Sequence, residues 1–300
     1  MGGSSFVSHL FHAAAAVEAG LCEVALIAYG STQRSASGRL VSGSETLTYE
    51  APYRPRYPVS AYALAASRHM HEYGTTREQR AEVAVAAREW AELNPKAFVR
   101  DDLSVEYVLR SRMVSSPLSV LDCCLVTDGG GAALVTSAER ARSLRKPPVY
   151  LLGAGEAHWH RNISQMPDLT TSAATESGPQ AYQMASLRPK DMDVVMLYDA
   201  FTINTVLFLE DLGFCEKGEG GPFVSGGKIS PGGELAVNTN GGGLSYNHPA
   251  MYGLLLFVEA VRQLRGECGE RQVADAALVH GSGGVLSSQV TAVLGSEEAL

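Results

Sequence analysis

The stretch "NTNGGGLSYNHP" at 238–249 has residue types that could stabilise negative charge on an oxygen atom. Glycine lacks a Cβ, so Gly241, Gly242 and Gly243 allow backbone N–H groups to approach an anionic oxygen closely. His248 follows them and precedes a proline, a residue that favours the first turn of a helix. An imidazole at a helix N-terminus could donate a hydrogen bond to a developing oxyanion. The stretch therefore predicts an oxyanion-binding site.

Two further stretches place polar residues and glycines at the ends of expected strands. They are "YDAFT" at 198–202 and "HGSGG" at 280–284. Because α/β folds bind ligands where strands end, His280 and Gly283 become further candidates for contact with a substrate oxygen. The alternative, which the spacing alone slightly favours, is a structural turn in which His248 only caps the next helix.

Pairs of histidines raise the question of a metal site. His69 with His71, and His158 with His160, stand two residues apart, and such a pair could face a metal ion from a strand. Neither pair is followed by a third or fourth ligand at a suitable spacing. Solvated surface pairs are therefore favoured, and no metal is predicted.

The elements that must position these residues alternate between helix and strand. The pattern predicts helices at 4–19, 58–74 and 76–95, a buried strand at 22–30, and a long loop at 31–60. Two segments, 123–137 and 277–295, each have the pattern of a strand, a glycine-rich turn and a second strand. Such alternation is typical of an α/β fold with a largely parallel sheet.

A domain boundary is expected at Pro147–Pro148, after which the strand–helix pattern restarts. It divides the chain into 1–147, which includes a loop region at 31–115, and 148–300. The similar closing segments suggest that the two parts are related halves.

Composition narrows the classes of function. The 300 residues are 45% hydrophobic with a formal net charge of -8, and no Lys/Arg-rich stretch points to nucleic acid. No uncharged apolar run is long enough to span a membrane. The cysteines form no CxxC motif, which is typical of reduced thiols in a cytoplasmic protein.

Together these stretches resemble the thiolase superfamily, most closely its sterol-carrier-protein-type or lipid-transfer-type members. "NTNGGGLSYNHPAMYG" is similar to the thiolase block that ends in Gly-His-Pro, and "YDAFT" to the block Asn-Glu-Ala-Phe. "DGGGAALVTSAERA" and "HGSGGVLSSQ" resemble the end of the first half and the final glycine-rich turn. The resemblance implies two similar βαβαβαββ halves packed as a five-layered sandwich.

The expected function follows from the positions at which this sequence differs from the thiolase pattern. Alignment on Gly20 places Gly3 where thiolases have their nucleophilic cysteine, and Cys22 lies at the wrong end of that helix. The second thiolase cysteine corresponds to His280, and the asparagine of the Asn-Glu-Ala-Phe block to Tyr198. Without a thiolate nucleophile there is no acyl-enzyme intermediate, so the ordinary thiolase reaction is not expected.

The pattern is similar to one branch of the superfamily, the steroid side-chain-cleaving aldolases. The resemblance implies retro-aldol cleavage of a β-hydroxy acyl-CoA, with Tyr198, Tyr246 and His248 as catalytic residues and no cofactor other than the CoA of the substrate. Two rivals stay open. One is an acyltransferase that uses Cys22, Cys123, or Cys124, and the other is a non-catalytic acyl-CoA-binding subunit.

The resemblance also implies partners. It predicts a homodimer formed through the strand at 22–30, and an OB-fold/zinc-ribbon partner protein that binds acyl-CoA. Family members have further strands and helices before the nucleophile helix, so the first half is expected to be incomplete at its N-terminus. Either the start codon is assigned late or the chain is a fragment.

Overall fold

The computed structural model describes residues 2–37, 48–273 and 275–299. Its helices are α1 (Ser5–Glu18), α2 (Val59–Tyr73), α3 (Arg77–Glu92), α4 (Val105–Arg110), α5 (Ala138–Arg142), α6 (Ala174–Ala185), α7 (Thr202–Asp211), α8 (Gly220–Val224) and α9 (Gly253–Leu264). Its strands are β1 (Val24–Ser31), β2 (Met113–Ser115), β3 (Leu118–Ser119), β4 (Gly129–Thr136), β5 (Tyr150–His158), β6 (Val194–Leu197), β7 (Ala236–Val237), β8 (Ala276–Gly283) and β9 (Ser288–Gly295).

A five-stranded sheet in the order β5-β9-β8-β6-β7 forms the centre of the molecule. The pairs β8–β6 and β6–β7 are parallel, whereas β9 is antiparallel to both β5 and β8. Every residue of β6, β8 and β9 is buried, so none of these strands has the alternating pattern of a strand with one exposed face, and β6 is a continuous apolar run.

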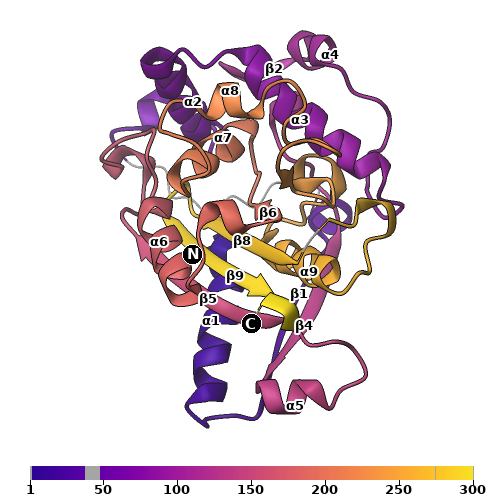
Figure 1. The fold of residues 1–300 in the computed structure, drawn as a ribbon. Coiled ribbons are helices and arrows are strands. Elements are labelled where there is room, and N and C mark those ends of the chain that lie inside the picture. Colours follow the sequence, from indigo (N-terminus) through magenta and orange to yellow (C-terminus); the bar gives the residue numbers. More distant parts are fainter. Residues whose placement is uncertain (1, 38–47, 274, 300) are drawn as a thin grey trace.

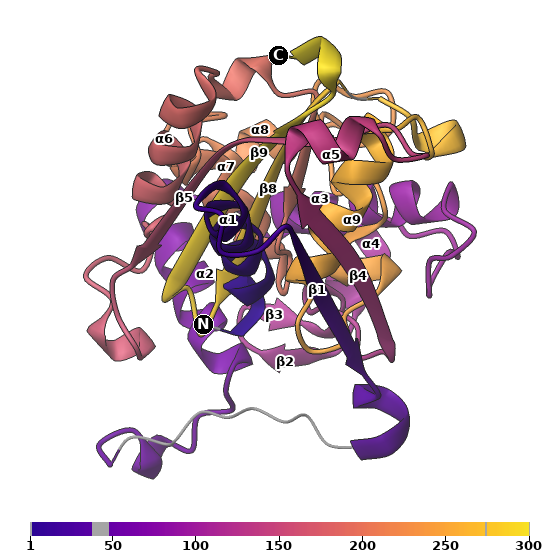
Figure 2. The ribbon, with the colours of Figure 1, turned by 90° about the horizontal axis from the view of Figure 1, so that it is seen from below.

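The sheet is covered by helices on both faces (Figure 1). Helix α6 packs on β5 and β9, while α1 and α9 pack on the opposite face. Beyond α1 and α9 lies an antiparallel ribbon made of β1 and β4 (Figure 2). The resulting order of helix, sheet, helix and ribbon buries each apolar surface against its neighbour and confirms the predicted α/β class.

A helical lobe made of α2, α3 and α4 lies over the end of the sheet at which β6 stops (Figure 1). Its longest helix, α3, begins with a capping box in which Thr76 and Gln79 exchange side-chain and backbone hydrogen bonds. The buried face of α3 packs on α7, α8 and the turn at Gly242–Tyr246. The lobe therefore closes the region where the candidate site residues lie.

The predicted helices at 4–19, 58–74 and 76–95 are confirmed as α1, α2 and α3. The predicted loop at 31–60 is described apart from 38–47, which lies outside the described residues. The expected boundary at 147–148 falls between α5 and β5.

Two expectations are wrong in detail. The segment at 123–128 is not a strand, because its backbone bonds reach irregular segments: Cys124 N–H donates to Ala200 O and Leu125 N–H to Gly243 O, each at 2.9 Å. The glycines that follow lie inside β4 rather than in a turn. Helix α9 begins at Gly253 and not at Pro249, so His248 does not cap it directly.

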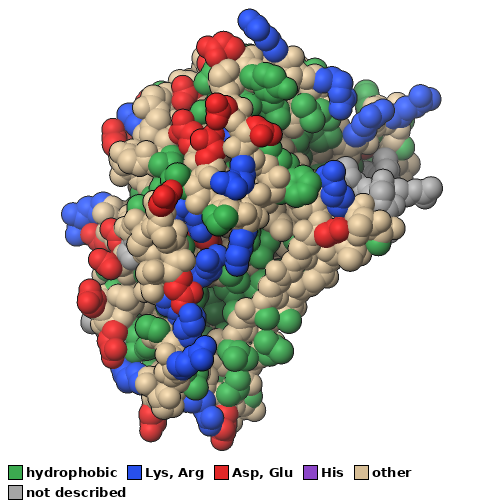
Figure 3. All heavy atoms as spheres, turned by 90° about the vertical axis from the view of Figure 1, so that its right-hand side faces the viewer, with side chains coloured by type: hydrophobic (Ala, Val, Ile, Leu, Met, Phe, Trp, Pro, Cys, Tyr) green, Lys and Arg blue, Asp and Glu red, His purple; other side chains and the backbone are tan. Residues whose placement is uncertain are grey.

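The face that carries the ribbon exposes large apolar side chains among charges of both signs (Figure 3). Leu26 on β1 is 66% exposed and Leu134 on β4 is 67% exposed. Within the described ranges, β4 is the one strand that pairs with β1. None of the described helices is long and apolar enough to cross a membrane.

Candidate active site

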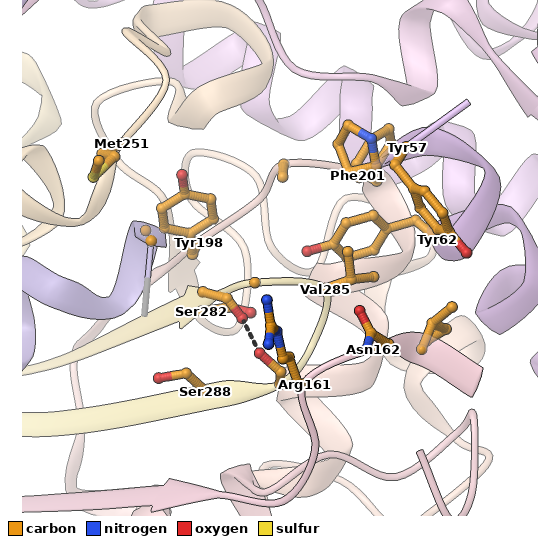
Figure 4. Close-up of a pocket in the computed structure, with 18 of the residues that line it drawn as sticks. Tyr57, Tyr62, Arg161, Asn162, Tyr198, Phe201, Met251, Ser282, Val285 and Ser288 are labelled. Atoms are coloured by element: carbon orange, nitrogen blue, oxygen red, sulfur yellow. Dashed lines mark hydrogen bonds between the residues drawn. The ribbon is translucent and has the colours of Figure 1, made fainter. Parts of the chain in front are cut away.

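A cavity of about 860 Å³ lies between the helical lobe and the end of β6. Segments far apart in the sequence meet in its wall, and Figure 4 labels several of their side chains. The wall contains residues 2–3, 57–58, 62, 124, 158, 160–163, 198, 200–201, 248, 250–251, 282–285 and 287–288. Among the predicted site residues, the structure brings Tyr198, His248 and Gly283 together here.

His248 presents an unpaired nitrogen in this cavity. Its backbone is held by Thr127, whose Oγ1 accepts from the His248 N–H at 2.9 Å. The imidazole Nε2 is buried and has no hydrogen-bond partner among the described residues. Burial lowers the pKa of His248 to about 4, so the ring is neutral at neutral pH. A neutral imidazole with a free Nε2 can donate to or accept from a ligand, depending on its tautomer.

Tyr198 follows β6 directly and stands beside His248. The two rings meet edge to face with their centroids 5.6 Å apart. The Tyr198 hydroxyl accepts from the N–H of Tyr252 at 3.2 Å and donates to the carbonyl oxygen of Ala250 at 3.3 Å. Burial raises the pKa of Tyr198 far above its usual value, which keeps the phenol protonated.

The ring of Tyr198 fills the space next to Gly3. A Cβ added to Gly3 would lie 2.3 Å from Tyr198 Cε2 and 2.6 Å from the carbonyl oxygen of Ser282. These distances are shorter than any that real Cβ atoms tolerate. Gly3 and Tyr198 are therefore sterically linked, and no side chain fits at Gly3 while the Tyr198 ring is in place.

The glycine turn comes close to a carboxylate and not to the cavity. Gly241 and Gly242 have φ values of +101° and +64°, and a Cβ on Gly242 would lie 2.0 Å from Asp199 Oδ2. The N–H of Gly243 donates to Asp199 Oδ1 at 2.6 Å. The three glycines are not among the residues that line the cavity, so the structure does not bring their N–H groups together with Tyr198 and His248 in its wall.

The carboxylate against which the glycine turn packs belongs to Asp199, which the sequence pattern did not single out. Its Oδ2 is buried and has no hydrogen-bond partner among the residues that the structure describes, and burial raises the pKa of its carboxyl to about 7. Asp199 lies between β6 and α7, and its carboxylate accepts from the backbone of the turn rather than facing solvent. Sequence spacing gave no sign of this long-range contact.

Tyr246 is not brought to the cavity. It is partly buried, and burial raises the pKa of its hydroxyl, with the charges of Glu259, Arg262 and Arg271 acting on it. It closes the glycine turn, whose last residues bond back to Gly241. Tyr246 is therefore the last residue of the turn and is not among the residues that line the cavity.

His280 lies behind the cavity wall. It is fully buried in β8, where its ring nitrogens bond Thr291 Oγ1 and Gln289 Oε1, each at 2.9 Å. Burial lowers the pKa of His280 to about 3. Gln289 Nε2 in turn donates to Ser282 Oγ at 3.3 Å, and Ser282 lines the cavity. His280 can therefore support the wall but cannot touch a ligand.

Four of the cysteines have a raised pKa and are therefore protonated thiols at neutral pH. Burial raises the pKa of Cys123, Cys215 and Cys268 to about 12 each and raises that of Cys124 further. Cys124 is the one cysteine among the described residues that lines the cavity. A buried thiol of this kind is a weak nucleophile.

An aromatic wall completes the cavity, and the sequence offered no sign of it. Tyr57 and Tyr62 come from the lobe, and the Tyr62 ring packs on Phe201 with centroids 4.4 Å apart. The α2 helix was predicted, but its pattern does not tell which tyrosine faces a ligand. In the described parts of the chain, no three His, Cys, Asp or Glu side chains are grouped as a metal site requires.

Comparisons with known proteins agree with this architecture. Residues 155–296 match the family described as thiolase C-terminal domain-like. The chain is 42% identical to an acetyl-CoA acetyltransferase of Methanothermobacter thermautotrophicus, covering 79% of this chain and 62% of that protein. It is 34% identical to a steroid side-chain-cleaving aldolase of Thermomonospora curvata, covering 88% of this chain and 71% of that protein.

A solved structure named Ltp2-ChsH2(DUF35) aldolase superimposes with a TM-score of 0.90 at 33% identity. The superposition covers 99% of this chain and 78% of that chain. The chain thus spans about two thirds of the length of the relatives that it matches.

Proposed function

Because this chain belongs to the thiolase superfamily, in its sterol-carrier-protein-type branch, we propose that it cleaves a carbon–carbon bond in a β-hydroxy acyl-CoA. The acyl group proposed is that of a sterol or a related bulky acid, as in steroid side-chain degradation. The observation that carries the proposal is the pairing of Gly3 with the Tyr198 ring. If Gly3 stands where thiolases have their nucleophilic cysteine, as the resemblance implies, this position offers no thiolate and is occupied by the ring of a tyrosine.

The proposed reaction is a retro-aldol cleavage. The bond between the α and β carbons breaks, and its electron pair forms the enolate of the thioester. A general base takes the hydroxyl proton as the β-oxygen becomes a carbonyl, and a general acid adds a proton to the α-carbon. The reaction is balanced without an oxidant or a reductant, and it needs proton-transfer groups and a donor to the enolate oxygen.

His248 and Tyr198 suit these needs. The unpaired Nε2 of a neutral His248 can donate to the thioester oxygen, whose negative charge grows as the enolate forms. The phenol of Tyr198 stays protonated and lies beside this imidazole, so it can supply a proton on the same side of the cavity. The aromatic wall of Tyr57, Tyr62 and Phe201 suits a bulky apolar acyl group.

An acyltransferase is the second candidate, favoured by the 42% identity to an acetyl-CoA acetyltransferase. It would have to use Cys124 in the cavity, or Cys22 or Cys123 outside the cavity. The raised pKa of Cys123 and of Cys124 disfavours thiolate chemistry at those two positions. The third candidate, a non-catalytic acyl-CoA-binding subunit, would keep the cavity without turnover.

Assembly belongs to the proposal. We expect a homodimer with an OB-fold/zinc-ribbon partner protein that binds acyl-CoA. Support comes from the solved structure named Ltp2-ChsH2(DUF35) aldolase, whose name joins two components. The exposed ribbon of β1 and β4 offers an apolar surface for one such contact.

The test is a cleavage assay on the chain alone and on the chain co-purified with its partner. A β-hydroxy acyl-CoA of a bulky ring acid is incubated with the protein, and mass spectrometry follows the ketone and the shortened acyl-CoA. We expect both products in equal amounts. A covalent acyl adduct on any cysteine after incubation with labelled acetyl-CoA would instead support the acyltransferase. An assembled complex that yields neither products nor adduct would support the binding subunit.

A further inference from the structure

The segment that carries His248 belongs to neither a helix nor a strand. It lies between the turn at Gly242–Tyr246 and helix α9, which begins at Gly253. Within this segment Ala250 has a φ of +72°, a left-handed conformation that costs a residue with a Cβ roughly 1–3 kcal/mol. Such a conformation persists only where its surroundings hold it, so contacts with other parts of the chain must fix this segment.

Thr127, which stands two residues before β4, binds both backbone polar groups of His248. Its Oγ1 accepts from the His248 N–H at 2.9 Å, and its own N–H donates to the His248 carbonyl oxygen at 3.3 Å. The Thr127 hydroxyl donates its hydrogen to Asn247 Oδ1 at 2.8 Å. Because Asn247 takes that hydrogen, the Thr127 oxygen is left to accept from the His248 N–H. One buried residue therefore fixes the backbone that carries the imidazole.

The ribbon of β1 and β4 holds the neighbouring residues of the same segment (Figure 2). Asn247 Nδ2 donates to the carbonyl oxygen of Asp128 at 3.3 Å, and the hydroxyl of Tyr29 on β1 donates to the carbonyl oxygen of Pro249. Gly129, the first residue of β4, leaves room for Asn247, because a Cβ there would lie 2.6 Å from Asn247 Nδ2. The end of the ribbon thus fixes the segment on both sides of His248.

The imidazole ring itself is held by packing and not by a hydrogen bond at Nε2. The Tyr198 ring meets it edge to face with centroids 5.6 Å apart, and the Tyr252 ring stacks on it with centroids 6.2 Å apart. Nε2 has no hydrogen-bond partner among the described residues. A shift of the His248 backbone would therefore displace the ring as well, since no bond at Nε2 resists it.

We propose that Thr127 is a positioning residue for His248, and that its hydroxyl orients Nε2 towards the thioester oxygen. The inference rests on the proposed acyl-CoA cleavage and adds the group that places its oxyanion donor. Thr127 is not among the residues that line the cavity, so it acts on the reaction only through His248. Placement matters because a displacement of about 1 Å at a reacting group can lower a rate by roughly 10²-fold.

The experiment compares Thr127→Val with Thr127→Ser in the assembled protein. Valine has the shape of threonine but no hydroxyl, so it leaves the His248 N–H buried without an acceptor, whereas serine keeps the hydroxyl. Steady-state kinetics on the β-hydroxy acyl-CoA of the cleavage assay give kcat and KM. We expect Thr127→Val to lower kcat by about 10–100-fold and to change KM less than about twofold. Thr127→Ser should keep kcat within about threefold of the wild type, because the hydrogen bond to His248 remains.

A second measurement needs no turnover. Nuclear magnetic resonance on protein that is isotope-labelled at the ring carbon Cε1 of its histidines reports on the surroundings of each Nε2, because the two atoms are bonded. The variant His248→Gln identifies the signal of His248 by its loss. We expect Thr127→Val to shift this signal, and Thr127→Ser to leave it in place.

Thr136→Val is the matched control, at the other end of β4. The Thr136 hydroxyl donates to the carbonyl oxygen of Glu23 at 2.8 Å, and Thr136 does not line the cavity. We expect this variant to change neither kcat nor the His248 signal. If Thr127→Val does not fold, Thr127→Ala replaces it, because alanine places no methyl group against Asn247 Oδ1.

Three results would overturn the inference. They are a Thr127→Val variant that keeps either the kcat or the His248 signal of the wild type, a Thr127→Ser variant that loses as much as Thr127→Val, and a failure of both hydroxyl-free variants to fold. A shifted signal in Thr127→Val that Thr127→Ser does not show, in a protein that cleaves no β-hydroxy acyl-CoA, would overturn the proposed function alone.

Discussion

The Tyr198 hydroxyl contacts Ala250 and Tyr252, while its ring fills the space beside Gly3. Tyr198→Phe removes the hydroxyl and keeps this packing. We expect kcat for cleavage to fall by roughly 10²–10⁴, the usual range for a lost acid or base, with little change in KM. Steady-state kinetics on the assembled protein measure both constants.

Tyr246→Phe is the informative comparison, because Tyr246 does not line the cavity. We expect it to lower kcat much less than Tyr198→Phe does. A loss as large as that of Tyr198→Phe would return Tyr246 to the catalytic set and show that the turn rearranges around the substrate.

The cysteines provide a second test at the residue scale. We expect replacement of all five by alanine or serine to leave cleavage largely intact, because protonated thiols have no part in the proposed reaction. Some loss of stability is expected where Cys123 and Cys124 are packed against the core. Turnover is measured beside thermal unfolding, and a folded single variant without activity would favour the acyltransferase.

At the scale of elements, the turn at Gly242–Tyr246 depends on close contact with Asp199. Gly242→Ala would combine an unfavourable positive φ with a Cβ placed against the Asp199 carboxylate. We expect the free energy of unfolding to fall by roughly 2–4 kcal/mol. Urea denaturation monitored by circular dichroism measures this change.

Gly20→Ala is the matched control for that loss. Gly20 has a similar φ of +70°, but apart from its two chain neighbours no described residue has an atom within 4 Å of the position that its Cβ would take. Gly20→Ala should lower the free energy of unfolding only by the backbone strain, about 1–2 kcal/mol. If both variants lost the same free energy of unfolding, contact between the new Cβ and Asp199 would contribute nothing to the loss in Gly242→Ala.

His280, which lies in β8 and bonds to β9, makes the free energy of unfolding depend on pH. Its folded pKa of about 3 lies below the usual 6.5, so between these values the unfolded state binds more protons. Stability from this group is therefore present above pH 6.5 and is lost as the pH falls towards 3. His248 acts in the same direction down to about pH 4, whereas the raised pKa of Asp199 acts in the opposite direction up to about pH 7.

We expect His280→Gln to flatten the dependence of stability on pH between about 6.5 and 4. The difference in slope from wild type should approach 1.4 kcal/mol per pH unit, the value for one proton. Denaturant unfolding at several pH values measures both slopes. Parallel slopes would mean that the imidazole takes up its proton in the folded protein as readily as in the unfolded chain.

At the scale of the whole molecule, the ribbon of β1 and β4 presents exposed Leu26 and Leu134 beside a strand edge. Exposed apolar strands are unfavourable unless another chain covers them. We expect a two-fold homodimer through this ribbon, and we expect Leu26→Lys to weaken it. Sedimentation velocity at micromolar concentration reports the oligomeric state. Met184→Lys is the control, because that side chain is 57% exposed on α6, which packs on the face of the sheet opposite to the ribbon. A wild type that sediments as a stable monomer would contradict the prediction.

The sequence by itself determined which segments meet at the site. Tyr198 follows a strand of four buried residues, Gly283 ends another, and both strands are neighbours in the sheet. Parallel neighbours end at the same edge, so residues after them converge whatever the details of packing. The sequence also shows that position 3 is a glycine and not a cysteine, which predicts a reaction without a thiolate nucleophile.

Only the tertiary structure decided which groups face the cavity. The turn after β7 is irregular, and in such a segment side-chain directions follow no period. There the buried Asp199 accepts the N–H of Gly243, and Tyr246 does not line the cavity. The lobe supplied Tyr62, whose position in α2 was predictable but whose contact with Phe201 joins residues far apart in the sequence. Long-range contacts satisfy buried polar groups and fill space, and neither requirement is local to the chain.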